Sequence, residues 1–168
     1  MTAGPSTELT ARLARVRLLC LDVDGVLSDG HLYWAGDGLW SQRFSVRDGY
    51  GIKLLQEAGV EIAVLSGGDV RSGRDRCASL GIVHAHFGIA DKVAVFRDVA
   101  GSLGIAADDA AFIGDELVDV PLLSQVGFAA TVPDAVDEVK AVVHYVTSRP
   151  GGDGAVRELC DLIRAHRG

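Results

Sequence analysis

Two acidic clusters in the sequence contain residues that could carry out chemistry. Asp22 and Asp24 come directly after an apolar run and are followed by Gly25, which allows the backbone to turn tightly. Two carboxylates in such a turn can share one hard cation and one reacting group. Asp22 could attack phosphorus and form an acyl phosphate, while Asp24 could protonate a leaving alkoxide and later activate water. The alternative interpretation of this pair is a capped loop without a chemical role. An Asp-x-Asp pattern alone is too common to decide between the two.

The second acidic cluster lies much further along the chain. Asp115, Glu116 and Asp119 fall within five residues, and they would repel the first pair across a shared site unless a cation lay between them. Ligand sets made only of oxygen favour Mg²⁺ over zinc or copper. Asp115 and Glu116 could instead only favour the start of the next helix, but that effect does not account for the first cluster.

Two features between these clusters suit the binding of a phosphate. Ser66 and Gly67 offer a hydroxyl and backbone N–H groups just before a predicted helix, and Lys92 stands at the start of another. The lysine could neutralise both a nucleophilic carboxylate and a transferring phosphoryl group. Each feature alone is typical of a turn, a helix cap or a solvated lysine. The order of all four features along the chain favours a catalytic site.

The composition excludes several classes of protein. The chain has 168 residues, of which 48% are hydrophobic and 23% are charged, so it can bury a core. A net charge of −7 argues against nucleic-acid binding, which needs a basic face. No apolar run is long enough to span a membrane, and the N-terminus lacks the pattern of a signal peptide. The three cysteines are far apart, which indicates reduced thiols and a cytoplasmic protein.

The elements that must position these residues alternate regularly along the chain. Buried apolar runs predict strands at residues 16–21, 60–65, 82–87, 110–113, 128–131 and 142–146. Helices are expected at the start of the chain, at its end, and at residues 47–58, 70–80, 91–103, 117–125 and 134–140. Residues 30–46 alternate around a Gly-Asp-Gly turn, which predicts a β-hairpin inserted after the first strand.

This order predicts one α/β domain over residues 1–168, with a Rossmann-like, doubly wound parallel sheet and a glycine-rich tail at 149–168. Ligands of such sheets bind beyond the carboxyl ends of the strands. Asp22, Ser66 and Asp115 each fall at a predicted strand end, and the phosphate-binding lysine begins the helix after another strand. We therefore expect these side chains to converge at one edge of the sheet.

The order Asp-x-Asp, Ser-Gly, Lys and Gly-Asp-Glu-x-x-Asp resembles the haloacid dehalogenase superfamily of phosphohydrolases. The similarity extends over nearly the whole chain. It is greatest to a small branch that lacks a cap domain and hydrolyses phosphorylated sugar acids. The segments that carry the resemblance to this branch are residues 21–30, 46–52, 75–82 and 151–158.

The resemblance implies a Mg²⁺-dependent phosphomonoesterase with an aspartyl-phosphate intermediate. Asp22 would be the nucleophile, and Asp24 would be the general acid and base. Mg²⁺ would be held by the Asp22 side chain, the Asp24 backbone carbonyl and Asp115. The phosphate would be bound by Ser66, Gly67 and Lys92.

The substrate implied by the resemblance is 3-deoxy-D-manno-octulosonate 8-phosphate (KDO 8-phosphate). One alternative is the 9-phosphate of N-acylneuraminate or of another nonulosonate, or a different small sugar phosphate. A second alternative is a non-catalytic assembly module with the same fold. The intact acidic clusters and the lysine argue against that module.

The resemblance also implies a role for the hairpin. In this branch the hairpins of several subunits pack together, so the implied assembly is a homotetramer in which neighbours supply the missing cap. The segment at 151–157 would approach a neighbouring active site. The residues suited to the hairpin contact are Tyr33, Trp34, Trp40 and Phe44, which could equally cover the core of their own subunit.

One departure from the branch concerns substrate recognition. Gly68 stands where its members carry Arg for the eight-carbon sugar acid and Glu for nine-carbon ones. Arg71 or Arg74 on the following helix could compensate. Arg47 and Asp48, where the hairpin returns to the core, could lie near the site or form an internal ion pair. The candidate substrate contacts are Arg47, Arg71 and Arg157.

Overall fold

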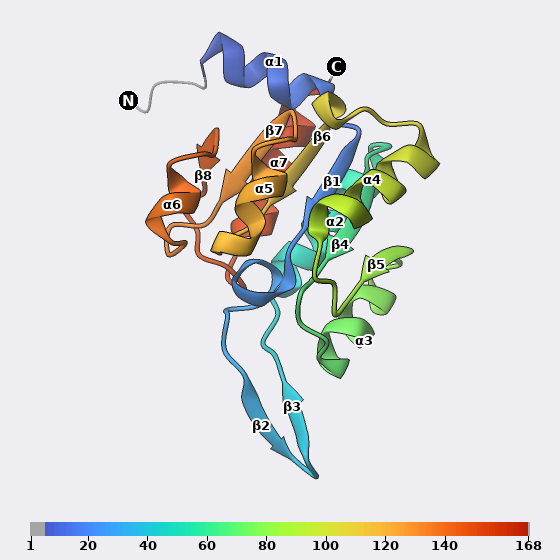
Figure 1. Cartoon of the computed structure of the whole chain (residues 1–168), viewed down its shortest axis with the longest axis vertical. Helices are drawn as coiled ribbons and strands as arrows, with labels where there is room; N and C mark the ends of the chain where they lie inside the picture. Colours follow the sequence, from blue (N-terminus) through green and yellow to red (C-terminus); the bar gives the residue numbers. More distant parts are fainter. Residues whose placement is uncertain (1–5, 168) are drawn as a thin grey trace.

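The computed structural model describes residues 6–167, and within them six parallel strands form a sheet in the order β5-β4-β1-β6-β7-β8 (Figure 1). The expected doubly wound parallel sheet is confirmed. β1 lies at its centre, paired with β4 on one side and β6 on the other. The strands are β1 (Leu18–Leu21), β4 (Glu61–Leu65), β5 (His84–His86), β6 (Ala110–Ile113), β7 (Phe128–Thr131) and β8 (Tyr145–Val146).

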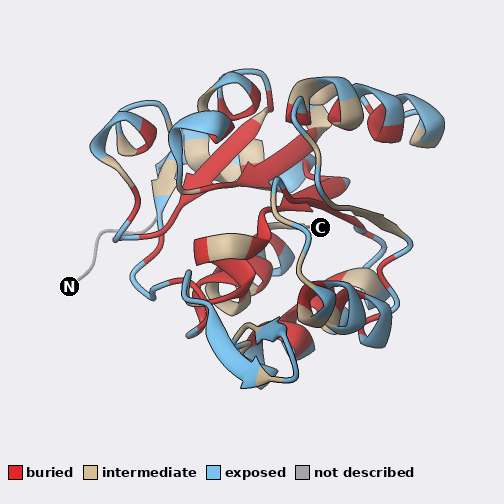
Figure 2. Cartoon of the chain, turned by 60° about the horizontal axis from the view of Figure 1, so that its bottom comes forward, coloured by how far each residue is buried: buried red, intermediate tan, exposed pale blue. Residues whose placement is uncertain are grey.

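The direction of each crossover decides which face of the sheet a helix covers. The chain moves outward from β1 to β5 and then returns through β6 to β8. Right-handed crossovers therefore place α2 and α3 on one face and α4, α5 and α6 on the other, while α7 packs along α2. Figure 2 shows the buried sheet between these two layers. The helices are α1 (Thr7–Arg15), α2 (Val46–Glu57), α3 (Arg71–Ser79), α4 (Lys92–Leu103), α5 (Val120–Leu123), α6 (Asp137–Lys140) and α7 (Ala155–His166).

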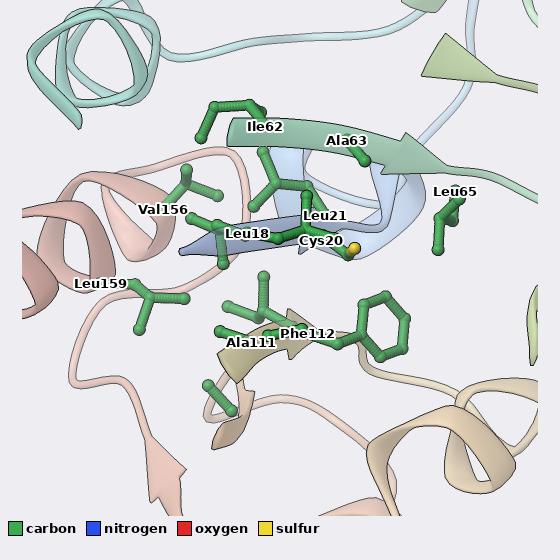
Figure 3. Packing of buried hydrophobic residues seen from close by; sticks show 14 of the residues in the cluster. Leu18, Cys20, Leu21, Ile62, Ala63, Leu65, Ala111, Phe112, Val156 and Leu159 are labelled. Carbon is green, nitrogen blue, oxygen red and sulfur yellow. The ribbon is translucent and has the colours of Figure 1, made fainter. Parts of the chain in front are cut away.

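The core lies on both faces of the central strands. Every residue of β1, β6 and β7 is buried, which is typical of parallel strands that are covered on both sides. Figure 3 shows Leu18 and Cys20 of β1 beside Phe112 of β6, with Val156 and Leu159 of α7 near the sheet. Burial of each large apolar side chain contributes about 1.5–3 kcal/mol, so the sheet is a stable base for the loops at its edge.

The hairpin is formed by β2 (Tyr33–Gly36) and β3 (Leu39–Ser41), and it projects from the end of the sheet (Figure 1). Asp37 and Gly38 form its turn with φ of +52° and +75°, the conformation that two-residue hairpin turns require. The predicted insertion is confirmed. Trp34 and Trp40 stack edge to face at 5.0 Å and remain 60% and 50% exposed, so they do not cover the core of this chain.

The prediction of one continuous helix at residues 117–125 is wrong in detail. The segment is divided into a 3₁₀ turn at Leu117–Asp119 and the short helix α5, because Glu116 caps the turn and Pro121 restarts the helix. β5 and β8 are shorter than expected, since each lies at an edge of the sheet and pairs with one neighbour. Within residues 6–167, no helix has both the length and the apolar character needed to cross a membrane.

Candidate active site

A tight turn at residues 22–27, called here the aspartate turn, follows β1. The Oδ1 atom of Asp22 accepts the N–H of Val23 at 2.7 Å. Gly25 has a φ of +79°, in the region that favours glycine. A Cβ atom on Gly25 would also collide with Oδ2 of Asp115. The missing side chain thus lets the two acidic clusters meet.

The second acidic cluster follows β6, the direct neighbour of β1. The two strands are paired in register, so the residues after them lie at the same edge of the sheet. Carboxylate oxygens of Asp22, Asp115 and Asp119 all lie within 4.8 Å of one another. Oδ2 of Asp119 accepts the backbone N–H groups of Asp115 and Glu116 at 3.0 and 3.2 Å. These bonds fix the loop that presents Asp115.

Lys92 extends from the start of α4 into the acidic cluster. Its Nζ atom lies 3.1 Å from Oδ1 of Asp22 and 2.6 Å from Oδ1 of Asp119. The side chain is buried and lies over the ring of Phe112, with Nζ 5.7 Å from the ring centre. One ammonium group is therefore shared between two buried carboxylates.

The charges in this cluster do not balance without a further cation. Burial is the main cause that raises the pKa of Asp22 to about 8, and Asp119 raises it further against the opposing effect of Lys92. Burial and then Asp119 raise the pKa of Asp115 to about 7. Burial lowers the pKa of Lys92, but its two carboxylate partners outweigh this effect and raise it. A divalent cation would relieve the repulsion among the carboxylates.

A cavity of about 270 Å³ opens at this edge of the sheet. A larger cavity, of about 390 Å³, lies beside α1 at the amino ends of the strands, where parallel sheets seldom bind ligands. The smaller cavity combines the acids with the lysine, so it is the candidate active site. It is lined by Asp22, Asp24, Gly25, Gly30, Gly67, Gly68, Lys92, Asp115, Glu116 and Val118.

The Ser-Gly pair reaches the same edge from the end of β4. Ser66 is buried, and its backbone joins the loop after β5 by accepting from Ile89 at 3.1 Å and donating to His86 at 2.9 Å. Gly67 lines the cavity, and Ser66 is the buried residue directly before it. The predicted convergence of the acids, the lysine and this loop is thus present in the structure.

One residue and one contact of the site were not expected from the sequence. Gln42, just after β3, donates from Nε2 to Oδ1 of Asp24 at 2.5 Å. No local pattern marks this glutamine, because it reaches the site only through the path of the hairpin. Asp119 belongs to the second acidic cluster, and its spacing from Glu116 is typical of a capping box. No sequence pattern indicates its bond with Lys92.

The arginines expected near the substrate do not line this cavity within the chain. Arg74 donates twice to Asp69, at 2.5 and 2.8 Å, and Arg157 donates to Asp161 at 2.6 Å. The side chain of Arg71 is 77% exposed and lines a separate cavity with Trp40 of the hairpin. The four expected arginines that do not line the cavity are Arg47, Arg71, Arg74 and Arg157.

The internal ion pair suggested for Arg47 and Asp48 is not formed. Asp48 is buried and accepts the backbone N–H groups of Arg157 at 2.8 Å and Gly154 at 3.4 Å. It therefore caps the start of α7, while Arg47 is exposed on α2. A carboxylate suits this place, because the first N–H groups of a helix lack partners within the helix.

Residues 151–154, called here the glycine segment, pack against the aspartate turn of the same chain. The N–H of Gly152 donates to the C=O of Val26 at 3.0 Å. A Cβ atom on Gly151 would collide with the C=O of Gly25. The segment thus supports the chain's own site. The approach of this segment to a neighbouring site, which the resemblance implied, stays a prediction.

Comparisons with known proteins agree with this geometry. Residues 78–159 match the family of haloacid dehalogenase-like hydrolases. A 3-deoxy-D-manno-octulosonate 8-phosphate phosphatase of Salmonella typhi is 43% identical over 166 residues, which are 98% of this chain and 88% of the relative. The chain belongs to this phosphatase family. The resemblance stated from the motifs is confirmed.

Solved structures of KDO 8-phosphate phosphatases share the fold of the chain. The enzyme of Yersinia pestis superposes with a TM-score of 0.93 at 40% identity, over 96% of this chain and 87% of that one. The enzyme of Moraxella catarrhalis gives 0.92 at 34% identity, over 95% and 92%. The latter structure is a complex with a magnesium ion, a phosphate ion and KDO.

Proposed function

We propose that the chain is a Mg²⁺-dependent phosphomonoesterase that hydrolyses KDO 8-phosphate. The observation that carries this proposal is the convergence of Asp22, Asp115 and Lys92 in one cavity at the carboxyl ends of β1, β6 and β5. The relatives named above are phosphatases for this substrate, and one of them binds Mg²⁺, phosphate and KDO together.

The chemistry begins with a carboxylate oxygen of Asp22 attacking phosphorus. The bond from phosphorus to the sugar oxygen breaks, and Asp24 gives its proton to that oxygen. In the second step Asp24 takes a proton from water, whose oxygen attacks phosphorus and breaks the bond to Asp22. Inorganic phosphate leaves, and both aspartates return to their starting state.

Lys92 has two roles in this scheme. Its contact with Asp22 at 3.1 Å holds the nucleophile in place and favours its ionised form. The same ammonium can offset negative charge on the transferred phosphoryl group. Positioning and charge stabilisation of this kind account for most of the catalysis of phosphoryl transfer. We propose that Ser66 and Gly67 provide the other side of the phosphate site.

The residues present fit a magnesium ion. We propose that Asp22, Asp115 and the backbone carbonyl of Asp24 hold it, because all are oxygen donors at one edge of the cavity. Asp119 is less suited, since Lys92 and two backbone N–H groups already occupy its oxygens. When bound, the ion supplies positive charge to the phosphoryl oxygens.

The test is phosphate release from a panel of phosphorylated sugars with and without Mg²⁺. The panel contains the eight-carbon and nine-carbon sugar acids and ordinary hexose phosphates, and Asp22→Asn is the control. We expect the highest kcat/KM for KDO 8-phosphate and a loss of at least about 1,000-fold in the control. Equal activity of the control would remove Asp22 as nucleophile, and flat activity over the panel would remove the substrate.

We also propose a cytoplasmic homotetramer assembled through the hairpin. The support is the exposure of Trp34 and Trp40 on a hairpin that projects from the sheet. Trp34→Ser with Trp40→Ser should reduce the mass measured by sedimentation while the circular dichroism spectrum changes little, because both rings are outside the core. An unchanged mass would contradict this assembly.

A further inference from the structure

Gln42 connects the base of the hairpin to the aspartate turn. It lies just after β3, and its Nε2 donates to Oδ1 of Asp24 at 2.5 Å. The bond joins segments 18 residues apart and is partly shielded from water. It is therefore a contact between two elements, and it depends on the place where the hairpin returns to the core.

Ser72, in the first turn of α3, fixes the orientation of this amide. Its Oγ atom accepts the backbone N–H of Gln42 at 3.1 Å and donates to Oε1 of the same residue at 3.4 Å. Because the hydroxyl occupies the amide oxygen, the NH₂ group of the amide faces Asp24. Oδ1 of Asp24 can accept this bond both when Asp24 is ionised and when its proton is on Oδ2, so the NH₂ group is the end that it needs.

Two glycines leave the space in which this pair lies. A Cβ atom on Gly68 would be 2.6 Å from Oδ2 of Asp24, and one on Gly73 would be 3.0 Å from Oε1 of Gln42. Neither glycine has a positive φ, so the lack of a side chain matters here for space alone. Gly68 also lines the cavity beside Asp24, which leaves Oδ2 next to open space.

We infer that Gln42 is a positioning residue for Asp24: it holds Oδ1 and leaves Oδ2 free, beside Gly68, for proton transfer to the leaving oxygen of the substrate. This inference rests on the proposed role of Asp24 as general acid. It gives the hairpin a function inside its own subunit, separate from any contact with a neighbour. It also gives a physical reason for glycine at position 68.

The test compares two substrates that differ in their need for an acid. An alkoxide from a sugar phosphate needs a proton to leave, whereas p-nitrophenolate leaves readily without one. Gln42→Met keeps the approximate length of the side chain and removes its hydrogen bonds. We expect kcat/KM for KDO 8-phosphate to fall at least about tenfold, and that for p-nitrophenyl phosphate to change less than about threefold.

Two further variants complete the experiment. Gln125→Met makes the same change on the far side of the sheet, where Gln125 accepts from Arg97 at 3.0 Å. It should leave kcat/KM for both substrates unchanged. Ser72→Ala should give a smaller loss of the same selective kind, and it decides the matter if Gln42→Met does not fold.

Parallel losses for both substrates, or no loss, would overturn the positioning role. A wild-type protein that is inactive on sugar phosphates would instead refute the proposed function itself.

Discussion

Lys92 is the residue on which the charge balance of the site depends. It lies between Asp22 and Asp119, and all three side chains are buried. Removing one partner of a buried ion pair leaves an uncompensated charge, which costs more than the pair itself contributes. The lysine is therefore needed for the stability of the fold as well as for phosphate binding.

Lys92→Met should lower the free energy of unfolding by about 3 kcal/mol and reduce phosphatase activity at least about 100-fold. Adding Asp119→Asn should restore part of the stability, because one of the two unpaired carboxylates is then neutral, but no activity. Urea unfolding and phosphate release measure the two effects separately. Stability unaffected by the first substitution would show that the ion pairs are not formed.

The sequence predicts part of this site and not the rest for a physical reason. Asp22, Lys92 and Asp115 could be found because each follows a strand or starts a helix, and parallel strands bring such positions together. Gln42 could not be found, since its contact with Asp24 depends on how the hairpin packs against α3. The direction in which Arg157 points depends in the same way on its neighbour Asp161.

At the level of elements, the aspartate turn depends on the glycine segment. Gly151 lies so close to the C=O of Gly25 that a methyl group would not fit. The N–H of Gly152 also bonds to the C=O of Val26. The glycine segment thus holds the loop that carries the nucleophile.

Gly151→Ala should lower the free energy of unfolding by about 2 kcal/mol and reduce activity at least about tenfold, because the added methyl group displaces the aspartate turn. Gly101→Ala is the matched control, since Gly101 lies in α4 with no atom near its Cβ position. The control should raise stability by about 0.8 kcal/mol through helix propensity. Equal effects of the two substitutions in urea unfolding would contradict this packing.

The order and type of the strands and helices follow from the sequence better than their ends or contacts. Buried apolar runs mark the central strands, and the Gly-Asp-Gly turn marks the hairpin. The division of the helix at 117–125 could have been expected from Pro121. The contact between the glycine segment and the aspartate turn could not, because no local pattern relates residues so far apart.

For the whole molecule, the acidic cluster makes stability depend on pH. Burial raises the pKa of Asp22 to about 8 and that of Asp115 to about 7, above the usual value of about 4 in an unfolded chain. Between about pH 4 and pH 8 the folded state therefore binds more protons than the unfolded state. The stabilisation from these protons is complete below about pH 4 and is lost as pH rises to about 8.

Chelator-treated protein should therefore melt at a temperature several degrees lower at pH 8.5 than at pH 5.5. Excess Mg²⁺ should remove most of this slope, because a bound cation favours the ionised carboxylates. Asp115→Asn should reduce the slope in chelator, since it removes one of the two groups. Thermal melts followed by circular dichroism measure all three, and a slope that Mg²⁺ leaves unchanged would place its origin elsewhere.

The contact between the glycine segment and the aspartate turn has a consequence for synthesis on the ribosome. The turn is made early, but Gly152 follows more than a hundred residues later, a delay on the order of 10 s at ordinary rates of translation. β6, which pairs with the far side of β1, is also made late. A nascent chain thus exposes an apolar edge of β1 until residues 110–113 are made, and an unsupported nucleophile loop until residues 151–154 are made, so chaperones have most to protect in this interval.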